Sequence, residues 1–335
     1  MSAGDEHVLG GARHLRSRQV SGEAGVSLRS ARRFWRALGF PNVDDALEAF
    51  TDADVAALHR VASLVRAGVV DEATALAMTR AVGRSVDRLA SWQLHLLAEV
   101  VAEQAAGEQA DDLAAGPLTP DEEARRVADL ITRLADDLEP LVVYAWRRHL
   151  ASSLERFVTE RSPQPDARQI VRSVGFADLV SFTSVVRRLS ERDLGALVQH
   201  FEATASDIVA SHGGRVIKTM GDEVLFVAQK VPAAAAIALD IATEMGVDEM
   251  LPEVRVGIAT GTVVARLGDV FGTTVNRASR LTSIARPGAV LVDDGTAAVL
   301  GEMSGFSCQP LRRRSLRGLG PVSPWLLRRR SGRGG

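Results

Sequence analysis

Two aspartates near the ends of predicted strands are the residues of this sequence best suited to bind a metal ion. Asp222 follows Gly221 in the stretch from Arg215 to Leu225, which reads as strand, tight turn and strand because β-branched and apolar residues flank the turn. Asp178 lies upstream, at the end of another apolar stretch. Magnesium typically binds one or two carboxylates and completes its shell with water and phosphate oxygens. Each aspartate alone is typical of a turn cap, whereas the two together favour a metal–phosphate site.

Three further polar residues favour an anionic ligand. Asn276 and Arg280 are four positions apart on a predicted helix, so they share one face. An amide and a guanidinium on one face can bind a phosphate or stabilise a developing oxyanion, although a solvated helix surface has the same composition. Lys218 lies inside the predicted hairpin, where lysine is uncommon unless it faces solvent or an anion.

The elements that position these residues alternate between strand and helix from residue 166 onward. The order strand–helix–strand–strand–helix–strand is the ferredoxin-like arrangement, so the expected fold class of this part is α+β. Near Thr260 and Gly261 two strands are expected to meet. The predicted strands are 169–179, the hairpin 215–228, 253–267, 290–293, 306–314 and 323–329, and the predicted helices are 183–212, 232–245, 274–285 and 296–301.

Residues 1–160 read as helical throughout and are expected to form an all-α regulatory or interaction domain. Their first eighteen residues, 1–18, are polar and expected to be disordered. Residues 141–163 are expected to form a connecting helix and linker, ending in the proline-containing stretch R-S-P-Q-P. The α+β domain is expected to span residues 166–330.

Two features inside the helical region carry their own expectations. Pro140 lacks a backbone donor and is expected to interrupt its helix. The pattern of residues 20–40 predicts two short helices joined at Gly25. This stretch resembles the start of a MerR-type winged helix, which binds DNA. A helical module that uses the same turn is the other interpretation, and nothing further along the chain supports DNA binding. The basic side of the second helix carries Arg29, Arg32, Arg33 and Arg36.

Composition limits the class of protein. A chain of 335 residues is long enough for two domains. Because 46% of the residues are apolar and only 4% are aromatic, the cores of these domains must be mainly aliphatic. A net charge of −2 favours neither nucleic acid nor a membrane surface as a partner. Cys308 is the single cysteine, so no intrachain disulfide can form. No export signal and no apolar run of membrane-spanning length is found, and the expected location is the cytoplasm.

Three motifs in the second half together resemble the catalytic domain of class III adenylate cyclases. They are F-A-D-L-V-S-F-T, K-T-M-G-D-E-V and G-D-V-F-G-T-T-V-N-R-A-S-R-L, and the similarity covers about residues 168–328. The resemblance implies a ferredoxin-like βαββαβ core with added elements. It also implies that two such domains pack head to tail, with the active site across their interface.

The resemblance assigns metal and base recognition to four residues. Asp178 and Asp222 correspond to the ligands of two Mg²⁺ (or Mn²⁺) ions per active site. Lys218 and Asp269 correspond to the residues that recognise adenine, because lysine can donate to ring N1 and aspartate can accept from the 6-amino group. Guanine reverses this donor–acceptor pattern, so a guanylate cyclase is the less favoured alternative.

The remaining assignments concern the ribose and the phosphates. Asn276 corresponds to the residue that orients the ribose, and Arg280 to the one that stabilises negative charge during displacement. Phe182 and Thr183 match the segment near the triphosphate, and Arg317 matches a basic position that reaches the phosphates. The implied reaction is attack of the ribose 3′-hydroxyl of ATP on the α-phosphorus, which gives 3′,5′-cyclic AMP and pyrophosphate.

Because one chain carries every residue of the set, the resemblance implies a homodimer with two equivalent sites and an inactive monomer. The helical first domain resembles regulatory modules of soluble actinobacterial cyclases, which include autoinhibitory and pH-responsive ones. His149 could titrate near neutral pH, although an exposed histidine beside two arginines is the plainer interpretation. A DNA-binding regulator whose cyclase-like domain only senses nucleotide remains the alternative from another functional class.

Overall fold

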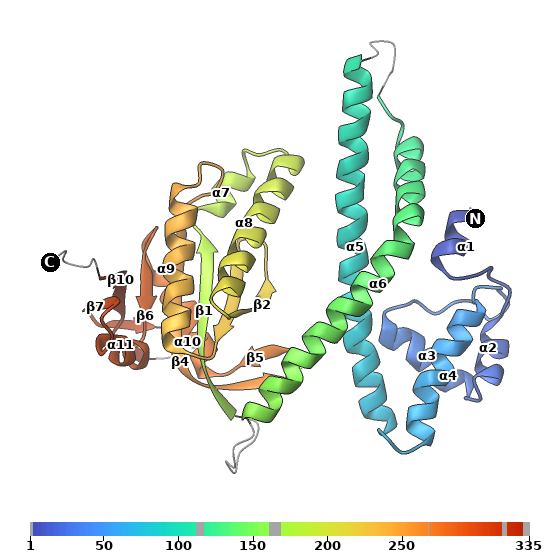
Figure 1. The fold of residues 1–335 in the computed structure, drawn as a ribbon, viewed down its shortest axis with the longest axis horizontal. Helices are drawn as coiled ribbons and strands as arrows, with labels where there is room; N and C mark the ends of the chain where they lie inside the picture. The colour runs from blue at the N-terminus through green and yellow to red at the C-terminus, as the bar shows by residue number, and fades with distance from the viewer. Residues whose placement is uncertain (1–2, 112–116, 161–168, 267, 317–319, 331–335) are drawn as a thin grey trace. The chain divides into compact units, whose positions relative to one another are not determined.

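The computed structural model describes residues 3–111, 117–160, 169–266, 268–316 and 320–330 (Figure 1). The chain divides into two compact units, Met1–Glu160 and Arg161–Gly335. The described part of the first unit is helical and the second unit contains the sheet, which confirms the expected α+β class. The role of the first unit as a regulatory domain stays a prediction.

The first unit begins with an ordered segment, so the expected disorder of residues 1–18 is wrong for the residues described there. Leu15 is buried and forms an isolated β-bridge with Phe50, which ties this segment to the core. One apolar side chain therefore anchors an otherwise polar stretch. The helices of this unit are α1 (Ala3–Val8), α2 (Ser17–Glu23), α3 (Leu28–Leu38), α4 (Asp52–Arg66), α5 (Glu72–Asp111) and α6 (Pro120–Glu160).

The short helices α2 and α3 form the predicted helix–turn–helix. The hydroxyl of Ser27 caps α3 by accepting a hydrogen bond from the backbone N–H of Ser30 at 3.1 Å. Two arginines on the basic side of α3 are paired with acids of the same unit. Arg32 contacts Asp45 at 2.6 Å and Arg33 contacts Glu72 at 2.8 Å.

The long helices α5 and α6 contain 40 and 41 residues. Helix α6 continues through Pro140, so the expected interruption at this residue is wrong. Pro140 is exposed, and water can therefore bond to the carbonyl group that loses its helical donor. Of the helices described, none combines the length and the apolar character needed to cross a membrane.

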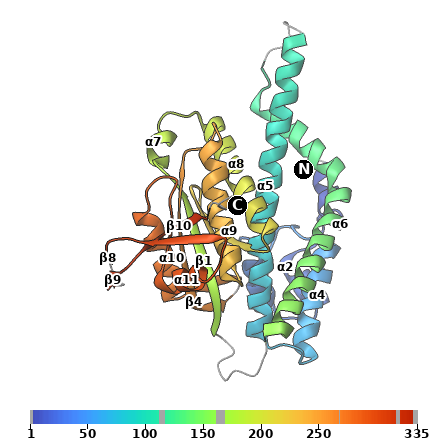
Figure 2. The ribbon, with the colours of Figure 1, turned by 60° about the vertical axis from the view of Figure 1, so that its left-hand side comes forward.

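The second unit is built around an eight-stranded sheet in the order β2-β3-β1-β4-β6-β10-β7, with β5 paired to β4 (Figure 1). Strands β8 and β9 form a separate two-stranded sheet that projects from the rest of this unit (Figure 2). The strands are β1 (Gln169–Leu179), β2 (Arg215–Thr219), β3 (Glu223–Ala228), β4 (Val254–Arg266), β5 (Asp269–Phe271), β6 (Val290–Val292), β7 (Phe306–Pro310), β8 (Arg314–Leu316), β9 (Gly320–Val322) and β10 (Trp325–Arg329).

Helices cover both faces of this sheet. Ala177 and Leu179 of β1 belong to the larger core, which they share with α8, α9 and α11. Val174 and Phe176 point to the opposite face and pack with α10, as alternation along a strand requires. The helices of this unit are α7 (Phe182–Val186), α8 (Glu191–Ser211), α9 (Val231–Val247), α10 (Thr273–Ile284) and α11 (Asp294–Gly301).

Strand β4 runs unbroken for 13 residues, so the expected meeting of two strands near Thr260 is wrong. Gly261 had suggested a turn. In the structure it makes room for α10, because a Cβ added to Gly261 would lie 2.8 Å from the hydroxyl of Thr274. Glycine inside a strand often marks such a close approach.

Candidate active site

The two predicted metal ligands lie at the same edge of the sheet, where β1 ends and β3 begins. Asp178, near the end of β1, pairs with Glu223 at the start of β3. The next residue, Leu179, donates its backbone N–H to the carbonyl of Asp222 at 2.9 Å. Burial raises the pKa of the Asp178 carboxyl, and the nearby charge of Asp222 raises it further. The fold therefore brings the two predicted ligands together, although their role as ligands stays a prediction.

Arg255 lies beside this pair and was not predicted from the sequence. It stands opposite Asp178 on β4, and its Nε and Nη2 atoms contact Asp178 Oδ2 at 2.6 and 2.5 Å. These contacts favour ionised Asp178, but burial outweighs them. A charged residue in the apolar run V-R-V-G-I was the signal that could have identified it.

Glu223 is a third carboxylate at this edge, and it too was missed. Burial raises its pKa to about 7, and the charges of Asp178 and Asp222 add to the effect, while Arg255 and Lys218 oppose it. Its position directly after Asp222 was the available signal. These three carboxylates lie beside one guanidinium, that of Arg255, which contacts Asp178, so carboxylates outnumber guanidinium groups at this edge.

The donor set at this edge fits a divalent ion. Among the described residues no group of three or more histidine, cysteine, aspartate or glutamate side chains is arranged to hold a metal. Asp178 and Asp222 would therefore supply two oxygen ligands and leave the remaining positions to phosphate and water, as magnesium prefers. A cation would also relieve the carboxylate crowding that contributes to the raised pKa of Asp178.

The chain makes a tight turn directly after β1. Ser181 has φ of 60°, the only positive φ of a non-glycine residue in the part of the chain described. Such backbone conformations are uncommon and are held in place by their surroundings. Phe182 follows and packs its side chain on the larger core, whereas Thr183 is exposed. Any contact of Phe182 with a triphosphate would therefore come from its backbone.

The predicted adenine-recognition residues contact each other directly. Lys218 Nζ lies 2.9 Å from Asp269 Oδ2, which joins β2 to β5. The register of β2 shifts between Val216 and Lys218, as at a β-bulge. Burial would raise the pKa of Asp269, but the hydrogen bonds from Lys218 and from the backbone N–H of Val270 lower it overall.

Asn276 and Arg280 lie on α10, as predicted, and both side chains are exposed. The helix is pressed against β4 at Gly257, where an added Cβ would lie 2.3 Å from the backbone nitrogen of Thr282. The position of these two residues therefore depends on a close helix–strand contact. Arg317 lies outside the described residues.

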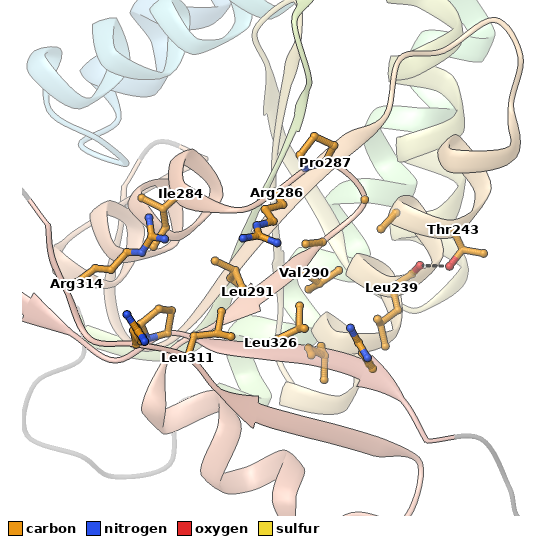
Figure 3. Close-up of a pocket in the computed structure, with 17 residues that line it drawn as sticks. Leu239, Thr243, Ile284, Arg286, Pro287, Val290, Leu291, Leu311, Arg314 and Leu326 are labelled. Carbon is orange, nitrogen blue, oxygen red and sulfur yellow. Dashed lines mark hydrogen bonds between the residues drawn. The ribbon is translucent and has the colours of Figure 1, made fainter.

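A cavity of about 810 Å³ lies elsewhere in this unit, next to the C-terminal half of α9, the end of α10 and strands β6 and β10. Figure 3 shows Leu291 and Leu326 among the apolar side chains that line it, with Arg286 and Arg314 beside them. None of the predicted site residues that the structure describes lines this cavity. It is therefore separate from the metal and purine groups.

Known proteins resemble this chain over two different spans. The pattern of the family described as "Adenylate and Guanylate cyclase catalytic domain" matches residues 167–329. An adenylate cyclase of Streptomyces coelicolor is 43% identical over 357 residues, covering 98% of this chain and 89% of that protein. An adenylate cyclase of Glutamicibacter nicotianae is 39% identical, with 98% and 82% covered.

Two further similarities are weaker. A Mycobacterium tuberculosis protein named as a pH-sensitive adenylate cyclase is 31% identical and covers 98% of this chain, which spans 83% of that protein. Among solved structures, the catalytic core of a rhodopsin–guanylyl cyclase with converted specificity, in complex with ATPαS, is 26% identical. It covers 48% of this chain and 97% of its own, with a TM-score of 0.45.

Proposed function

This chain belongs to the family of class III adenylate and guanylate cyclases, and we propose that it converts ATP to 3′,5′-cyclic AMP and pyrophosphate. The observation that carries the choice of ATP is the contact between Lys218 and Asp269 at 2.9 Å. A cationic donor and an anionic acceptor side by side match adenine, which accepts at N1 and donates from its 6-amino group. The names of the relatives support the same substrate.

Asp178 and Asp222 are the proposed ligands of two Mg²⁺ or Mn²⁺ ions. When bound, such ions lower the pKa of a coordinated hydroxyl and neutralise phosphate charge. Arg255 is held beside Asp178 by its two contacts, which would place a guanidinium next to a triphosphate that binds at this edge. The exposed side chain of Arg280 would stabilise the negative charge that develops on the α-phosphate, and Asn276 would orient the ribose.

The active enzyme is proposed to be a homodimer. Asp178 and Asp222 of one protomer would bind the metal ions, and Lys218, Asp269 and the α10 residues of the other would bind the nucleotide. An exposed apolar surface on α6 supports association, because Trp146 is 59% and Leu154 is 60% exposed in the single chain.

The first unit is proposed to modulate catalysis. The name of the Mycobacterium tuberculosis relative makes pH a candidate signal. His149 lies on α6, is exposed, and is the candidate for which a test is simplest. If it senses pH, His149→Gln in the full chain should flatten the dependence of cyclic AMP production on pH between about 6 and 8. An unchanged profile would remove His149 from the proposal. The expected place of action remains the cytoplasm, where ATP is abundant.

The direct test is an assay of the purified full chain with ATP and Mg²⁺ or Mn²⁺, with cyclic AMP measured over time. The proposal expects cyclic AMP from ATP and little cyclic GMP from GTP. Cyclic GMP as the main product would favour the guanylate cyclase alternative. No cyclic nucleotide from the dimer with either substrate would contradict the proposal.

DNA binding by α3 is the second candidate function, and the structure gives it little basis. Arg32 and Arg33 are already paired with Asp45 and Glu72, which reduces the charge available for phosphate contacts. A gel-shift assay at low salt checks this. Salt-dependent binding that is lost in Arg29→Ala and Arg36→Ala variants would restore the DNA-binding interpretation.

A further inference from the structure

Asp293 is the only buried charged side chain among the residues that the structure describes, with 2% of its surface exposed. Its Oδ1 atom accepts hydrogen bonds from the backbone N–H and the hydroxyl of Thr296 at 3.1 and 2.6 Å, and from the N–H of Thr260 at 3.3 Å. Its Oδ2 atom accepts a hydrogen bond from Arg277 Nη1 at 3.0 Å. One oxygen therefore caps α11, and the other binds α10.

The carboxylate is part of a longer polar chain through the sheet. The hydroxyl of Thr296 lies 2.7 Å from that of Thr260 on β4, which in turn lies 2.9 Å from the hydroxyl of Ser173 on β1. Ser173 and Thr296 are 1% and 0% exposed. Buried polar groups of this kind restrict a structure to one arrangement when each finds its partners. The network runs from the strand of Asp178 to the helix that carries Arg280.

Arg277 lies between the two predicted catalytic residues of α10. At about 100° per residue, Asn276, Arg280 and Arg277 lie within about 100° of the helix circumference. The close contact at Gly257 limits how far the helix lies from β4 but does not by itself prevent the helix from rolling. The ion pair between Arg277 and Asp293 lies beside the face of α10 that carries Asn276 and Arg280, and it resists such a rotation.

We propose that Asp293 and Arg277 are positioning residues for catalysis, which fix the rotation of α10 and so aim Asn276 and Arg280 at the nucleotide. This inference rests on the proposed function, because it takes the roles of those two residues from it. Misplacement of a reacting group by about 1 Å can lower a rate about a hundredfold. The pair therefore acts on kcat through Arg280 without touching the substrate.

The test is Arg277→Met in the full-length protein. The expected result is a decrease in kcat of roughly 10- to 100-fold, with KM for ATP changed less than about threefold. The fold should persist, because Asp293 keeps the three hydrogen bonds from Thr296 and Thr260. Asp293→Asn removes the charge and keeps an acceptor for the cap, so it should lower kcat in the same direction.

A second measurement separates positioning from general loss of structure. If the pair acts through Arg280, Arg277→Met should lower kcat much less in an Arg280→Lys background than in the wild type. Arg329→Met is the matched control, because Arg329 bonds Asp240 in the same unit and away from α10. This control should leave kcat within about twofold of the wild-type value.

The outcomes distinguish this inference from the one on which it rests. A wild-type protein that makes no cyclic AMP overturns the proposed function and the inference together. An active wild type with an equally active Arg277→Met variant overturns the positioning role alone. The positioning role is also overturned if Arg277→Met lowers kcat by the same factor in the Arg280→Lys background as in the wild type.

Discussion

At one end of the predicted site Asp178, Asp222 and Glu223 lie close together and Arg255 contacts Asp178, while at the other end Lys218 and Asp269 pair one to one. Burial and like charge raise the pKa of Glu223 to about 7, whereas the contact with Lys218 helps to lower the pKa of Asp269. The first group gains by binding a cation. The second is already neutralised, so under the proposed function a bound adenine would have to replace the contact between Lys218 and Asp269 with contacts to both side chains.

The largest effect should come from the crowded end. Asp222→Ala removes a proposed metal ligand and is expected to lower cyclic AMP production by about a thousandfold or more, because metal and substrate charge would both be left unbalanced. Circular dichroism should remain that of the wild type. Near-normal turnover would show that the surplus charge serves something other than metal binding.

A mixture of two inactive variants sharpens the comparison, since the two ends are proposed to serve different sites of a dimer. Asp178→Ala and Arg280→Ala chains mixed after separate purification should recover one intact site per heterodimer. Activity measured over the mixing ratio should peak near equal amounts. Two inactive chains that stay inactive when mixed would contradict a shared site.

The paired end should give an intermediate effect that depends on the base. Lys218→Met removes the donor to N1 and leaves Asp269 without its side-chain partner, so kcat/KM for ATP should fall by roughly 10- to 100-fold. The rate with GTP should change far less, because the lysine is not matched to guanine. Equal losses for both nucleotides would indicate a structural role for the pair.

The smallest effect concerns stability and has a defined dependence on pH. In metal-free protein Glu223 has a pKa of about 7 against 4.5 in the unfolded chain, so the folded state holds a proton that the unfolded chain has released. The stability linked to this proton is present below about pH 4.5 and is lost as the pH rises through about 7. Glu223→Gln should therefore raise the free energy of unfolding near pH 8 by about 3 kcal/mol at most.

Thermal melts in EDTA check this expectation. The variant should melt a few degrees above the wild type near pH 8, and the difference should shrink towards pH 4.5. A variant that is less stable than the wild type near pH 8 would mean that ionised Glu223 makes a favourable contact. Arg255 would then compensate the negative charge of these carboxylates better than the count of charges suggests.

Sequence patterns predicted the fold where local and tertiary preferences agree. The hairpin from β2 to β3 has a turn signal between two apolar stretches, and its bounds in the structure match the expected ones. The predictions failed where tertiary contacts determine the local structure. Gly261 reads as a turn but makes room for α10, and Leu15 orders a polar segment through its contact with Phe50.

The site could be predicted only in part for the same reason. Asp178 and Asp222 stand at visible strand ends, but the closeness of Asp178 to Glu223 and Arg255 follows from the register of three strands. Position in the sequence says little about which strands will be neighbours. The bond between Arg277 and Asp293 joins residues sixteen positions apart across a loop and a strand, and no periodicity marks it.

Gly257 has a consequence for how this protein can change over generations. Because the backbone of Gly257 lies directly against backbone atoms of Ala278 and Thr282, the spacing of α10 from the sheet is set there by van der Waals contact between the two backbones. Neighbouring core residues can exchange one aliphatic type for another without altering that spacing. Substitutions among these core residues therefore leave the positions of Asn276 and Arg280 unchanged. Gly257→Ala, in contrast, would displace α10 and with it both residues.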